Sequence, residues 1–330
     1  MDSARWATAH LMGTDVHVAV VGPDAAIEPS SVVERLAGLE RRWSRFVPES
    51  EVSALNARDG GGVLVSADTA ELLARSVEAW HATAGRFDPF VGDLLVELGY
   101  DGSFPWSGRR GRLPAPRPSP AQRVHVDVAT GLVDLGPGTR FDPGGIGKGC
   151  AADLVVDGLP EHLAAATGVL VNVGGDLRVW GVTPAGGWEV EVDHLVGPPV
   201  RVSLTHGALA TSSTRRRRWP LSDGGEAHHV VDPSTCRPVT GPVASVSVLA
   251  GEAWWAEAVA TAVLVGWGID GPDPVLVDLS GDLGVLVTTN DGEQFVLGGR
   301  GSEFMVVAPE ADGTLVESNV LEGSCREVVG

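Results

Sequence analysis

The alternation of apolar and polar positions predicts most of the regular structure of this chain. Residues 15–22 alternate and are rich in valine, as expected of a β-strand. Apolar side chains recur at helical spacing over residues 30–46 and 68–81, and they predict two helices that each bury one face. Two further helices are predicted over residues 151–159 and 254–265.

The order of the remaining segments decides the fold class. Residues 124–135 alternate like a β-hairpin, and residues 112–122 are proline-rich, which predicts a loop. Further strands are predicted over residues 169–181 with a break at Gly174–Gly175, over 188–195, over 201–213, and over much of 274–307. Helices and strands alternate irregularly and no internal repeat is visible. This favours an α+β fold with mixed or antiparallel sheets over a doubly wound one.

Charge and composition exclude several classes of function. The chain has 330 residues and a formal net charge of -19, so it lacks the clustered basic surface that nucleic-acid binding needs. Its three cysteines are far apart and fit neither a disulfide framework nor a zinc site. No run of about 18 apolar residues predicts a membrane span, and no apolar leader is visible, so a cytoplasmic location is expected.

A glycine-rich loop, "RFDPGGIGKGCAAD" over residues 140–153, is the first candidate for chemistry. It is not a Walker A loop, because Gly149 follows Gly147-Lys148 where Ser or Thr is required. Nor does it match the G-x-G-x-x-G dinucleotide motif. Exposed main-chain N–H groups, a helix start and a lysine would still suit an anionic oxygen. The alternative is a tight turn with a surface lysine.

Two other pairs of residues could carry chemistry. Glu257 and Thr261 are four residues apart on a predicted helix, so they share a face and offer the hard oxygen ligands that Mg²⁺ prefers. His229 precedes Asp232 by three residues and could act as a base that the aspartate orients. The alternatives are a partly solvated glutamate with a helix-interior threonine, and an ordinary Asp-Pro turn.

Two short motifs are ambiguous on their own. The run "TSSTRRRR" ends in Arg215–Arg218, which fits a solvated loop but also fits phosphate binding. The "GGD" of Gly174–Asp176 could bring main chain close to a ligand or could simply turn a strand.

The order of these motifs resembles that of the ApbE family, the FAD:protein FMN transferases. The resemblance spans about residues 11–300 and rests on eight segments in family order. These are "LMGT" (11–14), "PESEVSALN" (48–56), "TAGRFDPFVGDLL" (83–95), "DPGGIGKGCAAD" (142–153), "LVNVGGDLRVWG" (170–181), "ATSS" (210–213), "HHVVDP" (228–233) and "AEAVATAVL" (256–264).

The resemblance implies a single α+β domain over residues 1–330, with residues 301–330 as a variable segment and FAD in a cleft between two lobes. It implies a Mg²⁺-dependent enzyme that transfers FMN from FAD to a Ser or Thr hydroxyl of an acceptor flavoprotein and releases AMP. No nucleic-acid partner and no membrane span are implied.

The family's functional residues can be placed on this sequence. Metal ligands fall on Glu257, Thr261 and the main-chain carbonyl of Gly147, and the acid–base role falls on His229, which with Glu257 forms the catalytic pair. The flavin-nucleotide site is matched by Met12, Thr14, Asn56, Gly145, Lys148, Gly175, Asp176, Ser212, His229 and Asp232.

The sequence departs from the family pattern in four places. Glu257 replaces an aspartate, Ser213 replaces a glycine, and Cys236 stands where a family glycine supplies positive φ. Gly147 replaces an alanine in "GGIGKG". Two other functions therefore stay open, an FAD pyrophosphatase that uses water as acceptor and a non-catalytic flavin-binding protein. The choice between Mg²⁺ and Mn²⁺ is also open.

Overall fold

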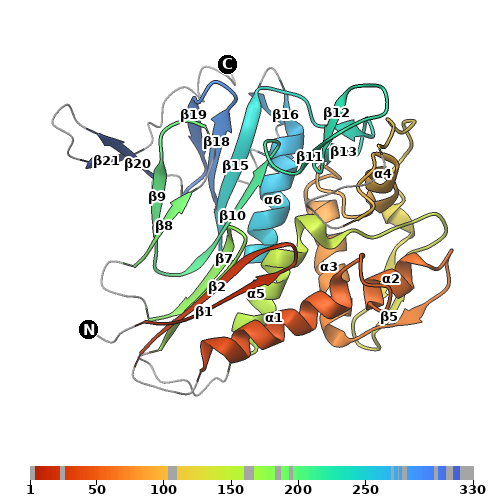
Figure 1. Cartoon of the computed structure of the whole chain (residues 1–330), viewed down its shortest axis with the longest axis horizontal. Coiled ribbons are helices and arrows are strands. Elements are labelled where there is room, and N and C mark those ends of the chain that lie inside the picture. Colours follow the sequence, from red (N-terminus) through yellow and green to blue (C-terminus); the bar gives the residue numbers. More distant parts are fainter. Residues whose placement is uncertain are drawn as a thin grey trace.

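A computed structural model describes most of the chain. The described residues are 4–22, 27–102, 110–159, 167–182, 187–192, 196–268, 271–273, 275–276, 281–300, 304–309 and 315–319. Figure 1 shows a broad central sheet with a smaller sheet on one side and helices on the other. The fold is α+β with antiparallel sheets, which confirms the class predicted from the sequence.

The central sheet has eight strands, and every pair within it is antiparallel. In spatial order the strands are β1 (Arg5–Leu11), β2 (Thr14–Val21), β6 (Gly168–Val173), β7 (Asp176–Gly181), β10 (Gly207–Ser213), β15 (Val243–Ala250), β18 (Gly284–Thr289) and β19 (Gln294–Leu297). The sequence break at Gly174–Gly175 is the turn between β6 and β7.

The two faces of this sheet carry different side chains. In β6, Val169, Val171 and Val173 pack into the core beneath the helices, whereas Leu170 joins a second core on the opposite face. The same alternation holds in β15, where Val248 faces the helices and Leu249 faces away. Because both faces are covered, these strands are apolar along most of their length.

The second face is covered by a four-stranded sheet. Its order is β21 (Leu315–Asn319), β20 (Phe304–Pro309), β9 (Val200–Leu204) and β8 (Trp188–Val192). The single strand predicted over 201–213 was wrong, because the chain leaves β9 at Leu204, turns, and enters the central sheet as β10. Gly207 makes this transition with φ of +92°, and a Cβ there would lie 2.5 Å from the Ala250 carbonyl.

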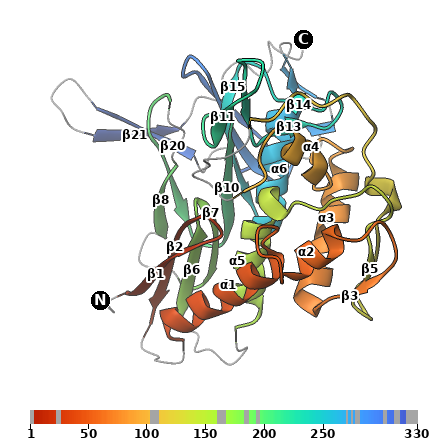
Figure 2. The same cartoon turned by 45° about the vertical axis from the view of Figure 1, so that its right-hand side comes forward.

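The helices lie on the first face of the central sheet. α1 (Pro29–Trp43), α5 (Gly147–Asp157) and α6 (Ala253–Gly266) pack directly on it, and α3 (Ala67–Ala82) contacts all three from outside. Figure 2, turned by 45°, brings this helical side forward. Two short helices, α2 (Glu51–Asn56) and α4 (Gly92–Glu97), were not predicted.

Two predicted helix boundaries were wrong in ways that matter for the site. α1 ends at Trp43 instead of residue 46, because Ser44 takes an extended conformation with ψ of 116° and turns the chain away. α5 begins at Gly147 instead of residue 151, so Lys148 lies in its first turn.

Small sheets and a proline-rich loop complete the described structure. The predicted hairpin is confirmed as β4 (His125–Asp127) and β5 (Leu132–Asp134), which pairs with β3 (Val63–Leu64). Three two-stranded sheets are formed by β11 (Arg218–Pro220) with β12 (Glu226–His228), β13 (Val231–Asp232) with β14 (Arg237–Pro238), and β16 (Trp267–Gly268) with β17 (Gly271–Pro272).

Some predicted segments are only partly described. Residues 112–120 form neither helix nor strand, followed by a 3-10 turn at Ala121–Arg123. Residues 193–195 of the predicted strand 188–195, several positions within 274–307, and much of 301–330 lie outside the described residues. In the described part of the chain, no helix combines the length and apolar character that crossing a bilayer requires.

Candidate functional site

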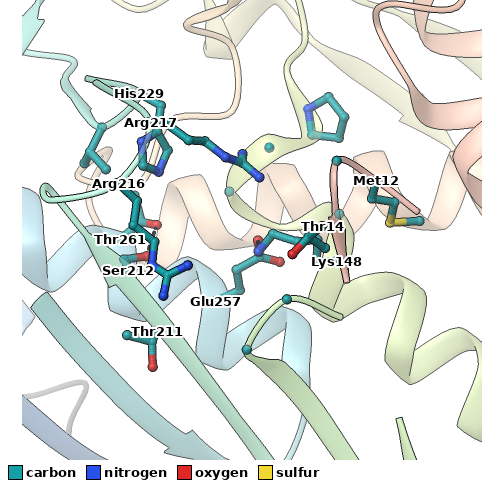
Figure 3. Close-up of a pocket in the computed structure, with 18 of the residues that line it drawn as sticks. Met12, Thr14, Lys148, Thr211, Ser212, Arg216, Arg217, His229, Glu257 and Thr261 are labelled. Atoms are coloured by element: carbon teal, nitrogen blue, oxygen red, sulfur yellow. Dashed lines mark hydrogen bonds and ion pairs between the residues drawn. The ribbon is translucent and has the colours of Figure 1, made fainter. Parts of the chain in front are cut away.

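A cavity of about 750 Å³ opens where β6 and β10 end and β2 and β7 begin. Its wall combines segments far apart in sequence, namely the β1–β2 turn, the glycine-rich loop with the start of α5, and one face of α6 (Figure 3). Ten of the predicted site residues line it: Met12, Thr14, Gly145, Gly147, Lys148, Gly175, Ser212, His229, Glu257 and Thr261.

Two of the lining residues, Lys148 and Glu257, form an ionic cluster with Asp176, which does not line the cavity; we call it the Lys148 cluster. The Lys148 ammonium hydrogen-bonds to Asp176 Oδ2 and lies 2.6 Å from Glu257 Oε1. Both carboxylates are buried, with residue exposures of 1% for Asp176 and 3% for Glu257. One ammonium thus faces two buried carboxylates, which leaves a net negative charge in the cluster.

Glu257 also ties its helix to α5. Its second oxygen, Oε2, accepts a hydrogen bond from the Gly149 main-chain N–H at 2.8 Å. This N–H belongs to the first turn of α5, where main-chain donors have no partner inside the helix. The close approach requires glycine, because a Cβ on Gly149 would lie 2.3 Å from the Ala253 carbonyl of α6.

A second buried carboxylate joins the same two helices in the opposite direction. Asp153 of α5 accepts hydrogen bonds from the main-chain N–H groups of Ala253 and Trp254 at 3.0 and 2.8 Å, at the start of α6. Arg178 Nε lies 3.0 Å from its Oδ1, and Arg75 lies beside its other oxygen. We call this the Asp153 cluster, and it does not line the cavity.

Thr261 lies one turn beyond Glu257 on α6, and both line the cavity, as their i, i+4 spacing predicted. The Thr261 hydroxyl is 2.9 Å from the Ser212 hydroxyl at the end of β10. A Cβ on Gly145 would come within 3.8 Å of the Thr261 oxygen, so the glycine-rich loop passes close above it.

These donors fit a hard divalent cation. Asp176 and Glu257 converge on one position that already holds a positive charge, and Thr261 adds a hydroxyl oxygen on the same helix face as Glu257. Among the described residues no group of three His, Cys, Asp or Glu side chains converges. A cation here would therefore complete its shell with hydroxyl, main-chain and water oxygens, as Mg²⁺ commonly does. The role of the Gly147 carbonyl stays a prediction.

His229 lies on the opposite wall, in the segment between β12 and β13. Its ring hydrogen-bonds to the main chain of Arg216, while its Nδ1 is buried and has no partner among the described residues. Burial, with the nearby positive charge of Arg217, lowers the pKa of His229 to about 3. The imidazole is therefore neutral at neutral pH.

Asp232 does not orient His229. Its carboxylate accepts hydrogen bonds from the Ser234 main-chain N–H at 2.8 Å and the Thr235 hydroxyl at 2.8 Å, so it closes its own turn. Of the predicted site residues, Asn56, Asp176 and Asp232 do not line the cavity. Asn56 instead hydrogen-bonds to both the N–H and the carbonyl of Phe141 at 2.8 Å, at the start of the glycine-rich loop. Their contact with flavin stays a prediction.

The sequence left open whether the arginine run Arg215–Arg218 is a solvated loop or a phosphate-binding segment. The structure divides the run between these two alternatives. Arg216 and Arg217 line the cavity, and in Figure 3 they lie on the same side as His229. Arg215 pairs with Asn290, and Arg218 pairs with Glu226 on an exposed hairpin. Arg217 holds φ of +49°, a conformation that non-glycine residues rarely adopt and that turns up preferentially at functional sites.

The periodicity of the sequence did not indicate one part of the cavity wall. Arg45 forms a buried ion pair with Asp142 at 2.6 Å, donates to the Tyr100 carbonyl at 2.8 Å, and stacks over the Phe46 ring at 4.2 Å. Arg45, Phe46 and Tyr100 all line the cavity. The helical spacing over residues 30–46 includes Phe46 and so predicted a helix there, but α1 ends at Trp43 and Phe46 lines the cavity instead.

The turn at Met12 brings main chain into the cavity. Met12 and Gly13 have φ of +54° and +68° and join β1 to β2 as a two-residue hairpin turn. The Met12 N–H donates to Glu40 at 2.6 Å, which anchors the turn to α1. Thr14 follows directly and packs against Gly174 of the β6–β7 turn.

Cys236 has the conformation expected for the family glycine that it replaces. Its φ is +58°, and its buried thiol accepts a hydrogen bond from the Arg117 N–H at 3.3 Å. The side chain therefore connects this turn to the proline-rich loop. Cys236 does not line the cavity.

Comparisons with known proteins identify relatives of this chain. The chain is 28% identical over 298 residues to an FAD:protein FMN transferase of Rhodobacter capsulatus, a match that covers 87% of this chain and 56% of that relative. It is also 28% identical over 290 residues to the FAD:protein FMN transferase of Treponema pallidum, covering 77% and 76% of the two chains. The chain thus spans little more than half the length of the Rhodobacter relative.

Solved structures with the same fold include the ApbE protein of Thermotoga maritima, with a TM-score of 0.73, 25% identity, and coverage of 88% of this chain and 96% of that one. The flavin transferase ApbE of Vibrio cholerae shares the fold with a TM-score of 0.71, 19% identity and 98% coverage of both chains. A sequence model described as the ApbE family matches residues 12–294. This chain therefore belongs to the ApbE family.

Proposed function

We propose that this chain, acting as one domain over residues 1–330, transfers FMN from FAD to a Ser or Thr hydroxyl of an acceptor flavoprotein and releases AMP. The observation that carries the proposal is the cavity itself. It brings a paired lysine, carboxylate and threonine from one side to face a neutral histidine and two arginines from the other. Relatives named FAD:protein FMN transferase support the same reaction.

The cavity offers a place for an extended dinucleotide between its two walls. On one side, the start of α5 presents main-chain N–H groups, which favour a pyrophosphate oxygen. On the other, Arg216 and Arg217 supply guanidinium groups suited to phosphate. Phe46 and Tyr100 add apolar ring surface for a planar ring system. When FAD binds in this cavity, its two central phosphates would lie beside the Lys148 cluster.

A divalent cation would be held by Glu257, with Thr261 and the Gly147 carbonyl completing the protein ligands. When bound, it would neutralise charge on the pyrophosphate. Mg²⁺ is the ion that we propose, because the site offers only oxygen donors and few protein ligands.

His229 would move the proton in this reaction. The acceptor hydroxyl oxygen attacks the FMN-side phosphorus, a new P–O bond forms, and the bond from that phosphorus to the bridging oxygen breaks, so that AMP leaves. The hydroxyl proton passes to the unpartnered Nδ1 of His229, which is neutral and able to accept it. Phosphates nearby would raise the lowered pKa of His229 and so strengthen it as a base.

Incubation of purified protein with FAD, Mg²⁺ and a candidate flavoprotein tests the proposal. The expected result is release of AMP together with a mass gain of one FMN on a Ser or Thr of the flavoprotein. AMP and free FMN without labelled acceptor would instead identify a pyrophosphatase. The absence of AMP under all metal conditions, with FAD bound, would identify a non-catalytic binding protein.

A further inference from the structure

Lys148 is the only lysine in the chain. The sequence has 24 basic residues of the Lys and Arg type, and every other one is arginine. All the remaining ion pairs described here, buried and exposed, use arginine or histidine. The Lys148 cluster is therefore a position where this chain uses a compact ammonium in place of a planar guanidinium.

The two cations differ in how firmly they are held. A guanidinium binds carboxylates through a rigid fork of donors, whereas an ammonium is a point charge on a flexible four-carbon stem. The Asp153 cluster does not line the cavity and so cannot contact a ligand bound there. Its cation is Arg178. In the Lys148 cluster, where Lys148 and Glu257 line the cavity, the cation sits on a flexible side chain that can move.

One oxygen of Glu257 cannot bind both the Lys148 ammonium and a divalent metal ion tightly. Lys148 occupies Glu257 Oε1 at 2.6 Å, while Glu257 Oε2 is held by the Gly149 N–H. A divalent ion on Glu257 would therefore take the oxygen that Lys148 holds, and it would repel the ammonium at short range. Displacement leaves the ammonium inside the cavity, on the side where phosphates would lie.

We propose that Lys148 is a displaceable counter-ion, which holds the cation position of Asp176 and Glu257 until a divalent ion enters, and which then turns its charge toward the FAD pyrophosphate. That the anion is the FAD pyrophosphate rests on the proposed function. Displacement predicts positive coupling between metal and FAD, because FAD stabilises the displaced lysine that the metal requires.

Mn²⁺ binding to protein without FAD is the direct test, measured by calorimetry on the purified full chain. Lys148→Met removes the competing ammonium, and we expect its Mn²⁺ dissociation constant to fall at least about tenfold, within the usual range for coupled sites. FAD should tighten Mn²⁺ binding to the wild type, and this effect should be smaller in Lys148→Met, where only the direct attraction between the metal and the FAD phosphates remains. Mn²⁺ affinity that is unchanged or weaker in the variant would overturn the proposal.

Two controls separate competition from a general loss of charge. Lys148→Arg keeps the charge and should bind Mn²⁺ no more tightly than the wild type. Arg35→Met also removes one positive charge, from an ion pair with Asp68 that does not line the cavity, and should leave Mn²⁺ affinity unchanged. Tighter binding in Arg35→Met would show a bulk charge effect and overturn the proposal.

A second measurement is the thermal stability of Lys148→Met, because this substitution leaves two buried carboxylates without their cation. We expect its melting temperature to fall without metal and to recover with Mg²⁺ by more than the wild type gains. Because the chain has one lysine, protein labelled with [13C]lysine should also show one Cε signal that shifts when Mg²⁺ is added. A signal that stays unshifted at saturating Mg²⁺ would contradict displacement. These measurements need no acceptor, so they can fail or succeed independently of FMN transfer.

Discussion

The Lys148 cluster and the Asp153 cluster both connect helices α5 and α6 through buried carboxylates, but they do so differently. In each, a carboxylate on one of the helices α5 and α6 accepts hydrogen bonds from main-chain N–H groups at the start of the other. In the Asp153 cluster two amides and arginine side chains surround one carboxylate. In the Lys148 cluster one lysine and two amides, those of Gly149 and Thr211, serve two carboxylates.

The difference shows how a buried charge is made structural or reactive. Asp153 is fully enclosed, and its partners are two main-chain amides and the guanidinium groups of Arg178 and Arg75. Glu257 is also buried, but it lines the cavity, and it shares the single Lys148 ammonium with Asp176. A fully paired carboxylate holds helices together, whereas an underpaired one beside a cavity can take up a cation.

The largest expected effect is on catalysis through Glu257. Glu257→Gln keeps the size of the side chain but removes its charge, so AMP release from FAD at saturating Mg²⁺ should fall roughly 10³-fold. Glu257→Asp keeps the carboxylate and serves as the control, with activity retained to a larger extent. Equal activities of the wild type and Glu257→Gln would show that the Lys148 cluster is structural, like its counterpart.

The second effect should fall on stability through Asp153. Asp153→Ala leaves the amides of Ala253 and Trp254 and the Arg178 guanidinium without their acceptor, which should cost about 3–5 kcal/mol in the free energy of unfolding. Urea denaturation measures this cost. At temperatures where the variant stays folded, AMP release per folded molecule should remain near the wild-type value, in contrast with Glu257→Gln.

A substitution at Gly149 should disturb both clusters together. A Cβ there would lie 2.3 Å from the Ala253 carbonyl, so Gly149→Ala should force α5 and α6 apart at a cost of about 1–3 kcal/mol. Gly38→Ala is the matched control, since that glycine lies within α1 with its nearest neighbour at 3.7 Å. It should raise stability by up to about 1 kcal/mol through helix propensity. Equal effects of the two substitutions would show that the helix contact is not tight.

The smallest effect is a pH dependence of stability that separates His229, on the cavity wall, from Asp153, which does not line the cavity. The pKa of His229 is lowered to about 3, so the unfolded chain binds its proton more readily, and this contribution to stability is lost as pH falls from about 6.5. Burial raises the pKa of Asp153 to about 6, which has the opposite sign, because stability from its protonation is present at low pH and lost as pH rises through 6.

His229→Gln should therefore lose less stability between pH 7 and pH 5 than the wild type, as followed by melting temperature at each pH. The difference between the two proteins isolates His229, because Asp153 is common to both. A wild type and variant with parallel pH profiles would place the His229 pKa near its ordinary value.

Local patterns predicted the elements better than their ends. The valine-rich strands and the helices over 30–46, 68–81 and 254–265 were visible because their packed faces repeat at fixed spacing. The end of α1 at Trp43 was not visible, since Phe46 continues the same spacing although it packs outside the helix. The division of residues 201–213 between two sheets depended on a turn whose partners lie elsewhere in the chain.

The sequence by itself determined the fold class, the family resemblance and ten residues of the cavity wall, because motif order and side-chain type are local properties. Only the tertiary structure decided which charges meet. It paired the single lysine with Asp176 and Glu257, set Asp232 and Asn56 to holding main chain, and turned Arg216 and Arg217, but not Arg215 and Arg218, toward the cavity. The physical reason is that a carboxylate or a cation acquires its role from partners distant in sequence, and those partners are chosen by packing.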